Sequence, residues 1–399
     1  MVQLKNQKPI ELGIRNVVRL GYVSLFTDLS TEMILGVLPF FIIKELGATA
    51  TILGIIEGLA EAVNYFFRVV SGVLTDKIGR RKPFVLLGYA LSSITKPFFA
   101  ITSTWSHAFI IRIFDRSGKG IRTSPRDALI SDSAKKSETG KAFGLHRSLD
   151  QIGAVGGPII AFAFIPLIGI RGIFWLSFIP AVIALLILLF FVRDIKSSVK
   201  HRSVFENARS VLDRQFIMLL GALAIFTMGA YNFSFVLLKA GSLGVNQNLI
   251  PLVYASLNVA VVIISLPAGM MADKIGKIPV LILGYAVFII ASFTGLFLNG
   301  NPIYAFPIAI IFGCYLGIAE TVQRAIMPDY ASVQLKGTAY ALYYSMIGIG
   351  ALIANSVFGI LWTNIGYVAA FEYSIIMGIA GSIALIIFLT QKKRLIKTA

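Results

Sequence analysis

The 399-residue chain is 57% hydrophobic and only 14% charged, and its mean hydropathy is +0.82. Because a soluble domain carries about 25% charged residues, this composition excludes an ordinary soluble protein and predicts one embedded in a membrane. The net charge of +17 is assigned to membrane topology and anionic lipid headgroups rather than to nucleic acid, since the basic residues are concentrated in alternate loops.

Apolar segments follow one another along the whole chain, and each has the about 20 residues that a membrane-spanning helix needs. Hydrocarbon cannot satisfy an open sheet edge, so these segments are predicted to be helices. The expected fold class is therefore all-α, with twelve transmembrane helices near 17–43, 50–73, 83–102, 106–131, 140–166, 172–192, 215–239, 249–271, 278–298, 302–326, 337–362 and 368–390.

Loops rich in Lys and Arg alternate with loops that contain few. By the positive-inside rule, this alternation places both termini in the cytoplasm and predicts a multi-pass protein of the plasma (inner) membrane. The first sixteen residues show no signal-peptide pattern, and the lone Cys314 cannot form an intrachain disulfide. The basic stretches are 74–82, 132–141, 193–214, 273–277 and 391–399.

The second half of the chain repeats the first. The segment GVLTDKIGR at 72–80 returns as GMMADKIGK at 269–277, which is 197 positions later. At the same offset, GKAFGLHRS at 140–148 returns as GTAYALYYS at 337–345. A constant offset over half the chain predicts two copies of one fold unit, which in membrane proteins is the architecture of secondary transporters.

The repeat also defines the expected domains. Six-helix bundles are predicted at 1–192 and 215–399, and each finds its partner within the chain, so a monomer is expected. The linker 193–214 has apolar residues at helical spacing among basic ones, and it is predicted to be an amphipathic helix on the cytoplasmic surface. The segment Gly88-Tyr-Ala returns as Gly284-Tyr-Ala, at an offset that is one residue shorter than the common offset of 197.

The sequence resembles the major facilitator superfamily over nearly its whole length. The segment 72–81 is similar to the loop between that family's second and third helices, and 269–277 occupies the equivalent loop of the second copy. The runs 118–130 and 27–33 resemble a prokaryotic subgroup described only as facilitator permeases. The resemblance implies two six-helix halves that rock about a central substrate site.

Two further motifs resemble those of proton-driven exporters in the same superfamily. Ile152–Pro158 is similar to the Gly-Pro motif of their fifth helix. Arg112 begins a pattern similar to their fourth-helix motif, but Asp115 and Arg116 depart from it where exporters have Gln and Gly. The first motif favours export, and the departure in the second argues against a multidrug exporter.

The repeated loop is predicted to be a cytoplasmic gate. The resemblance implies that Asp76 and Asp273, placed just past helix ends, accept from N–H groups at the start of helix 11 and helix 5 in the opposite half. Gly72 and Gly79 would permit close helix approach and a sharp turn. The full set expected at this gate is Gly72, Asp76, Gly79, Arg80, Arg81, Asp127, Gly269, Asp273, Gly276, Lys277 and Arg324.

Acidic residues within the expected spans are candidates for ion coupling, because charges there are costly. Asp28 and Glu32 lie four residues apart on one helix face, and we expect them to share a proton-binding site whose protonation releases a cation such as Arg116. A structural pair with a helix 4 Arg is the alternative. Glu57 and Glu61 have the same spacing and either line the outer vestibule or pair with Arg68 or Arg147.

A cationic stripe is predicted along helix 4, because steps of three and four place its basic residues on one helix face. These cations either bind the substrate or form salt bridges at the gate. His146 is expected to be a helix-end residue, and the glycines of helices 5 and 11 (Gly153, Gly156, Gly157, Gly348 and Gly350) are assigned to close helix packing. The substrate-cavity candidates are Arg112, Asp115, Arg116, Lys119, Arg122, Arg126, Arg147, Asp150, Tyr231, Asn232, Tyr254, Asn258, Glu320, Gln323, Tyr343 and Tyr344.

The two copies differ in charge. At the common offset, Arg122 corresponds to Ala319, Arg126 to Gln323, and Asp150 to Ile347. If these charges served only folding, both copies would need them. We therefore expect the N-terminal copy to supply charge and ion coupling, and the C-terminal copy to supply aromatic and amide groups.

Together these patterns predict a secondary active transporter for a small anionic or zwitterionic solute, coupled to protons, with export favoured. A multidrug, cation or metal-chelate transporter of the same fold is the alternative, and a channel or lipid scramblase is the alternative of another class. Direction and the choice of H⁺ or Na⁺ stay open. No phosphate loop and no hydrolase motif occurs, so neither an ATP-driven pump nor an enzyme is expected. No cofactor and no metal site is expected.

Overall fold

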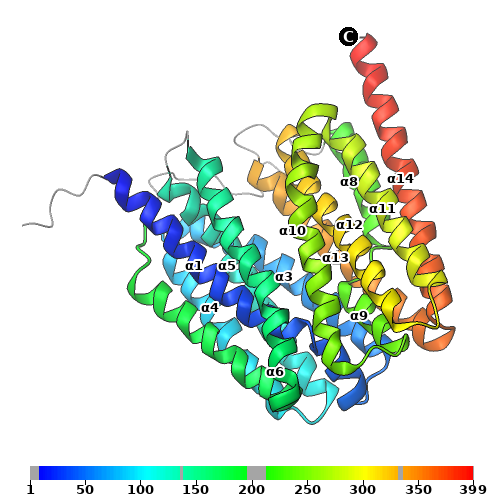
Figure 1. Ribbon diagram of the computed structural model, residues 1–399. Helices are drawn as coiled ribbons and strands as arrows, with labels where there is room; N and C mark the ends of the chain where they lie inside the picture. The colour runs from blue at the N-terminus through cyan, green and yellow to red at the C-terminus, as the bar shows by residue number, and fades with distance from the viewer. Residues whose placement is uncertain (1–8, 135–137, 196–212, 331–335, 399) are drawn as a thin grey trace, which may run out of the picture. The chain divides into compact units, whose positions relative to one another are not determined.

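The computed structural model describes residues 9–134, 138–195, 213–330 and 336–398 (Figure 1). Most of the predicted amphipathic helix at 193–214 lies outside these residues. Throughout the described ranges the secondary structure is helical, which confirms the all-α prediction. Long helices form because apolar residues dominate each span and every backbone group is satisfied within its own helix.

Two compact units divide the chain. The first comprises Met1–Leu35 and Phe66–His201, and the second comprises Gly36–Tyr65 and Arg202–Ala399. The helix α3 (Ala50–Ile78) therefore contributes its first half to the second unit and its second half to the first. The expected boundary within 193–214 stays a prediction.

The first unit, called the N-terminal unit below, packs four further helical segments with the end of α3. They are α1 (Pro9–Leu35), α4 (Lys82–Thr95) with the 3-10 turn η2 (Lys96–Ile101), α5 (Trp105–Ser133) and α6 (Thr139–Phe190). The long α6 changes direction at Gly169, whose φ of 67° is outside the helical region, so it contains two of the expected spans.

The second unit, called the C-terminal unit below, contains the second set of helices. They are α2 (Leu38–Phe40) with the π-helical turn η1 (Phe41–Glu45), α8 (Arg214–Thr227), α9 (Phe233–Ser242), η4 (Gln247–Leu249) with α10 (Ile250–Ile275), α11 (Lys277–Phe297), η5 (Pro302–Tyr304) with α12 (Ala305–Ile326), η6 (Met327–Tyr330), α13 (Lys336–Asn364) and α14 (Tyr367–Thr398).

Two expected spans are interrupted. The first breaks between α1 and α2, just before Pro39, which lacks the N–H that a continuous helix would use. The seventh divides into α8 and α9, and the Asn232 side chain caps α9 by accepting from the Ser234 N–H at 2.9 Å.

Within the described ranges, nine helical segments are long and apolar enough to cross a membrane by length and composition. The segment Thr139–Phe190 is counted once there although it holds two spans, and α8 and α9 are each too short alone. The helix α5 is long enough, but charged residues run along it. The twelve-span prediction is consistent with these assignments.

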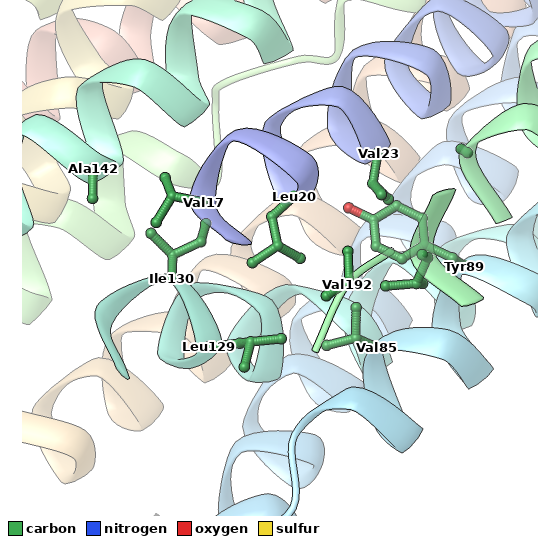
Figure 2. Close-up of a cluster of buried hydrophobic side chains, with 11 residues drawn as sticks. Val17, Leu20, Val23, Val85, Tyr89, Leu129, Ile130, Ala142 and Val192 are labelled. Carbon is green, nitrogen blue, oxygen red and sulfur yellow. The ribbon is translucent and has the colours of Figure 1, made fainter. Parts of the chain in front are cut away.

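A buried hydrophobic cluster holds α1, α4, α5 and α6 of the N-terminal unit together. Figure 2 shows Val17, Leu20 and Val23 of α1 facing residues of α4 and α5, with the Tyr89 ring at the edge of the cluster. Full burial of a Val or Leu side chain contributes about 1.5–3 kcal/mol relative to exposure. This cluster fixes α1, α4 and α5 against one another directly beside the charged residues described below.

Glycines allow α1 and α6 to pack closely. A Cβ at Gly153 would overlap the carbonyl oxygen of Leu25, and one at Gly157 would lie 2.6 Å from that of Leu29. In the C-terminal unit, a Cβ at Gly350 would lie 2.7 Å from a Thr227 methyl carbon. These contacts confirm the packing role expected of the helix 5 and helix 11 glycines.

The substitution Gly153→Ala is therefore expected to lower the free energy of unfolding by about 1–3 kcal/mol, because the new methyl group must push α1 away. Thermal unfolding in detergent measures this loss. Gly144→Ala on the same helix is the matched control, since a Cβ there meets nothing within 4 Å. Equal unfolding temperatures for the two variants would contradict the packing role.

Candidate transport site

Asp115 is the centre of a buried ionic network in the N-terminal unit. Its carboxylate accepts from the Ser92 hydroxyl of α4 at 2.6 Å and from Arg112 Nη1 at 3.5 Å. Arg116 Nε lies 3.9 Å from the same carboxylate. All three charged residues are buried. The predicted stripe is therefore directed into the unit, and two of its cations share one carboxylate.

A close contact between α4 and α5 positions the next cation of the stripe. A Cβ at Gly88 would lie 2.6 Å from the Gly118 carbonyl oxygen and 2.7 Å from the Arg122 backbone nitrogen. This proximity brings the Arg122 guanidinium over the Tyr89 ring, with Cζ 4.5 Å from the ring centroid. A cation over an aromatic face is electrostatically favourable.

Ser24 connects three helices near this cation. Its hydroxyl lies 2.8 Å from His146 Nε2 of α6 and 3.3 Å from the Tyr89 hydroxyl of α4. Arg126 Nη1 donates to the same oxygen at 3.3 Å, while its Nη2 pairs with Asp127 at 2.9 Å. His146 is thus buried within α6 and contacts α1, which differs from the expected helix-end placement.

Two carboxyl groups meet between α1 and α6. The carboxyl groups of Asp28 and Asp150 lie close enough to repel each other electrostatically, and Asp150 accepts from Arg147 Nη1 at 2.9 Å. A hydrogen bond between two carboxyl groups requires a proton on one of them. Glu32 and Lys119 interact electrostatically with Asp28. Asp150 of α6 therefore acts on Asp28 more strongly than Glu32 does.

The loop between α3 and α4 of the N-terminal unit is held by one arginine. Arg81 Nη1 donates to Asp76 at 2.9 Å, and its Nε donates to Asp132 at 3.0 Å. The backbone N–H groups of Arg81 and Lys82 both donate to Asp194. Burial alone would lower the pKa of Arg81, but the hydrogen bonds and attraction of the two carboxylates outweigh it and raise that pKa.

One expectation about this loop needs correction. Asp76 and Asp273 lie within the last turns of α3 and α10, not past the helix ends. Each helix continues to a glycine, Gly79 or Gly276, with φ of 69° or 95°, which ends it sharply. Gly72 was expected to permit close approach, yet a Cβ there would meet Ser124 at 3.4 Å, an ordinary contact distance.

Arg81→Gln is expected to lower the free energy of unfolding by about 1–2 kcal/mol, because two partly buried carboxylates lose their shared partner. Chemical denaturation in detergent measures the change. Arg80→Gln removes an exposed charge from the neighbouring position and serves as the control. If both substitutions cost the same, Arg81 does not hold this loop.

In the C-terminal unit, uncharged residues occupy the positions that correspond to the ionic network, and Arg112 and Arg116 correspond to Ala309 and Gly313. Phe312 of α12 corresponds to Asp115, and Phe288 of α11 corresponds to Ser92 at the one-residue-shorter offset. The Tyr231 ring packs against both, with centroid distances of 5.1 and 5.4 Å. The positions of Asp115 and Ser92 are therefore part of an aromatic core in the C-terminal unit, and part of a charged network in the N-terminal unit.

Sequence comparison identifies the family. The model of the Major Facilitator Superfamily matches residues 20–238 and 217–399. The chain belongs to the Major Facilitator Superfamily. An uncharacterized MFS-type transporter of Methanocaldococcus jannaschii is 32% identical over 397 residues, covering 96% of this chain and 97% of the relative. The superfamily consists of transporters and not of enzymes.

Two weaker similarities add to this assignment. The quinolone resistance protein NorA of Staphylococcus aureus is 24% identical over 170 residues, which cover 43% of this chain and 43% of NorA. The crystal structure of a point mutant of the nucleoside transporter NupG has a TM-score of 0.78 at 12% identity, and the match covers 94% of this chain and 99% of that chain. At that identity the likeness shows the fold alone.

Several cavity candidates of this superfamily member make contacts within the C-terminal unit. Gln323 donates to the Tyr285 hydroxyl at 3.2 Å and accepts from the Tyr343 hydroxyl at 2.9 Å. Tyr254 stacks on Phe233 with centroids 4.8 Å apart. Tyr231 and Tyr254 are buried, so these rings pack in the unit's interior instead of presenting the aromatic surface that was expected.

The remaining candidates of the C-terminal unit form local contacts. Arg324 pairs with Glu320 at 3.1 Å, and Lys277 pairs with Asp329 at 2.7 Å. Tyr344 stacks on Tyr65, with centroids 5.6 Å apart. The backbone N–H of Asn232 donates to the Asn355 side chain, and Glu61 accepts from Asn64 at 3.1 Å. Glu57 is fully buried, and Asn258 is partly buried.

Sequence reasoning missed Lys96, the first residue of η2. It is 1% exposed, and its Nζ donates to the Ser30 hydroxyl at 2.9 Å. A lysine followed by proline inside an apolar span is a signal that could have revealed it, because a charge there is costly. Ser24, Tyr89 and Ser92 were missed because hydroxyl groups within a span carry no comparable signal.

Proposed function

We propose that this protein is a secondary active transporter that moves a small anionic or zwitterionic solute by rocking-bundle alternating access. The observation that carries the proposal is the buried ionic network around Asp115. The equivalent positions of the other unit hold uncharged residues, Phe312 in place of Asp115 among them. Buried charges are expensive, and the second copy folds without them, so a function beyond folding accounts for the first.

Proton coupling is proposed at the Asp28 and Asp150 pair. A proton shared by the two carboxyl groups would join α1 to α6, and its loss would leave two negative charges close together. The pair would then separate, or Arg147 and Lys119 would each take one carboxylate. A proton gradient could therefore bias the contact between two helices of the transport unit. A metal-chelate or multidrug function has no comparable support among these contacts.

Export is the proposed direction. The Gly-Pro motif of α6 at 152–158 resembles that of proton-driven exporters, and part of the chain is similar to a quinolone resistance protein. We place the protein as a monomer in the plasma (inner) membrane with both termini cytoplasmic, because the basic loops alternate. The gate contacts of Asp76 and Asp273 with helix starts in the opposite half stay predictions.

Counterflow in liposomes tests the proposal. Purified protein is first screened by thermal unfolding against organic anions, phosphorylated metabolites, amino acids, divalent metals and lipophilic cations. The stabilising solute is then loaded unlabelled into proteoliposomes, and a trace of labelled solute is added outside. A transporter gives transient uphill accumulation that saturates with concentration. Linear, non-saturable flux, or movement of labelled lipid between leaflets without solute flux, would support a channel or a scramblase instead.

A further inference from the structure

Two buried cations of the N-terminal unit, Lys96 and Arg122, form no ion pair with any carboxylate of the described ranges. Their exposed fractions are 1% and 3%. Asp115, Asp28 and Glu32 attract Lys96 without pairing with it; Asp115 is shared by two arginines, and Asp28 lies near Asp150. An unpaired buried charge is strongly destabilising, so this pair of cations calls for an explanation.

Arg122 has unused hydrogen-bond donors. Its Nε and Nη1 atoms are buried and have no hydrogen-bond partner among the described residues. The Tyr89 ring lies under the guanidinium at 4.5 Å, which offsets part of the charge but accepts none of these in-plane N–H groups. Arginine presents such donors as a planar fork, a geometry that matches a carboxylate or a phosphate.

Lys96 has spare donor capacity as well. Its ammonium has three protons, and it donates to the Ser30 hydroxyl at 2.9 Å and to the Thr27 carbonyl at the limiting distance of 3.5 Å. Arg122 is close enough to repel it electrostatically. Two neighbouring buried cations with free donors constitute an excess of positive charge, which an anionic group could neutralise.

The second copy shows that the fold does not need these cations. Lys96 corresponds to Ser292 at the shorter offset, and Arg122 corresponds to Ala319 at the common one. The helix contact itself is retained, because a Cβ at Gly284 would lie 3.7 Å from the Ala319 backbone nitrogen. The same α4–α5 type of crossing thus forms with Ser and Ala at these positions.

We propose that Lys96 and Arg122 bind an anionic group of the transported solute, either a carboxylate or a phosphate. This inference rests on the proposed transport function and assigns the recognition of charge to two residues. Arg112 and Arg116, by contrast, are already paired with Asp115. The unengaged Nε and Nη1 of Arg122 and the remaining proton of Lys96 would donate to the bound oxygen atoms.

Thermal unfolding of purified protein with simple anions tests the assignment. The probes are inorganic phosphate and acetate, each compared with chloride at constant ionic strength. We expect at least one probe to raise the unfolding temperature of the wild type in a saturable manner. Lys96→Ser and Arg122→Ala, the residues of the second copy, should weaken that binding by about tenfold to a hundredfold, since each removes charge-assisted hydrogen bonds.

Without anion, both variants should unfold at the wild-type temperature or above it, because each removes a buried charge that forms no ion pair with a carboxylate of the described ranges. Arg15→Gln, which removes an exposed charge from α1, should leave anion binding unchanged. A response to phosphate alone would assign a phosphorylated solute, and a response to acetate alone a carboxylate. Lower anion-free stability with unchanged affinity would overturn the proposal, as would a wild type that neither anion stabilises.

Counterflow separates this inference from the transport function. If the wild type carries out counterflow and both variants keep its rate and half-saturation, the cation pair does not bind solute, although transport stands. If the wild type shows no counterflow for any stabilising solute, the transport function itself fails. The expected result is wild-type counterflow whose half-saturation rises at least about tenfold in each variant.

Discussion

Asp115→Ala should lower the free energy of unfolding by about 3–5 kcal/mol, because it leaves buried arginines without their shared carboxylate. Arg112 and Arg116 both lie against Asp115, and Ser92 loses its acceptor as well. Lys96, which Asp115 also attracts, would lose part of its compensation. Chemical denaturation in detergent measures the loss through the shift of the midpoint.

Asp127→Ala provides the comparison on the same helix. Its side chain is 45% exposed and pairs with Arg126 at 2.9 Å, so its removal should cost less than about 1 kcal/mol. A network that holds the unit together requires a clear difference between the two variants. Similar midpoints for both would mean that the arginines around Asp115 find water or other partners.

Asp28→Asn should abolish proton-driven accumulation of the solute while leaving counterflow in place. The amide can still hydrogen-bond to Asp150, but it cannot take up or release a proton. The proton gradient therefore can no longer drive transport through this residue. Accumulation under an imposed pH gradient and counterflow without one are measured in the same liposome preparation. Accumulation is expected to fall to the level of empty liposomes.

Asp150→Asn should reproduce this loss, because the proton belongs to the pair. Glu138→Gln removes an exposed carboxylate at the start of α6 and should leave both activities at the wild-type level. If Asp28→Asn accumulates solute normally and Glu32→Gln does not, the coupling site is Glu32, and the carboxyl pair has only a structural role.

The helices and the repeat could be predicted from the sequence because both depend on local pattern. Apolar spans of sufficient length form helices in hydrocarbon, and glycine at 79 and 276 ends two of them with positive φ. The breaks in the first and seventh spans were not predicted. These breaks depend on Pro39 and on the capping side chain of Asn232. A hydropathy average over a whole span does not reveal the effect of such single residues.

Partner choice could not be predicted in the same way. Helical spacing showed that Asp28 and Glu32 share a face and that the α5 cations form a stripe, but it does not reveal which helix the face meets. The partner of Asp28 is Asp150, more than a hundred residues away on α6. Tyr231 was placed in a cavity because it is polar, whereas its ring packs among four phenylalanines in the core.

Comparison of the two copies was the most informative sequence observation. It separated charges that the fold tolerates losing from contacts that both copies keep, such as Gly88 with α5 and Gly284 with α12. Lys96 was missed in this comparison, because the one-residue-shorter offset was applied only to the Gly-Tyr-Ala repeat. Extending that offset to Ser292 would have identified the lysine as specific to one copy.

Solute-driven proton movement is the most direct test of proton-coupled transport by this protein. Proteoliposomes containing a trapped pH-sensitive dye receive the stabilising solute on one side, with no pH gradient imposed. We predict a change of internal pH that depends on solute concentration, saturates, and disappears in Asp28→Asn. Solute flux that saturates without any proton movement, in wild type and variant alike, would contradict coupling through the carboxyl pair.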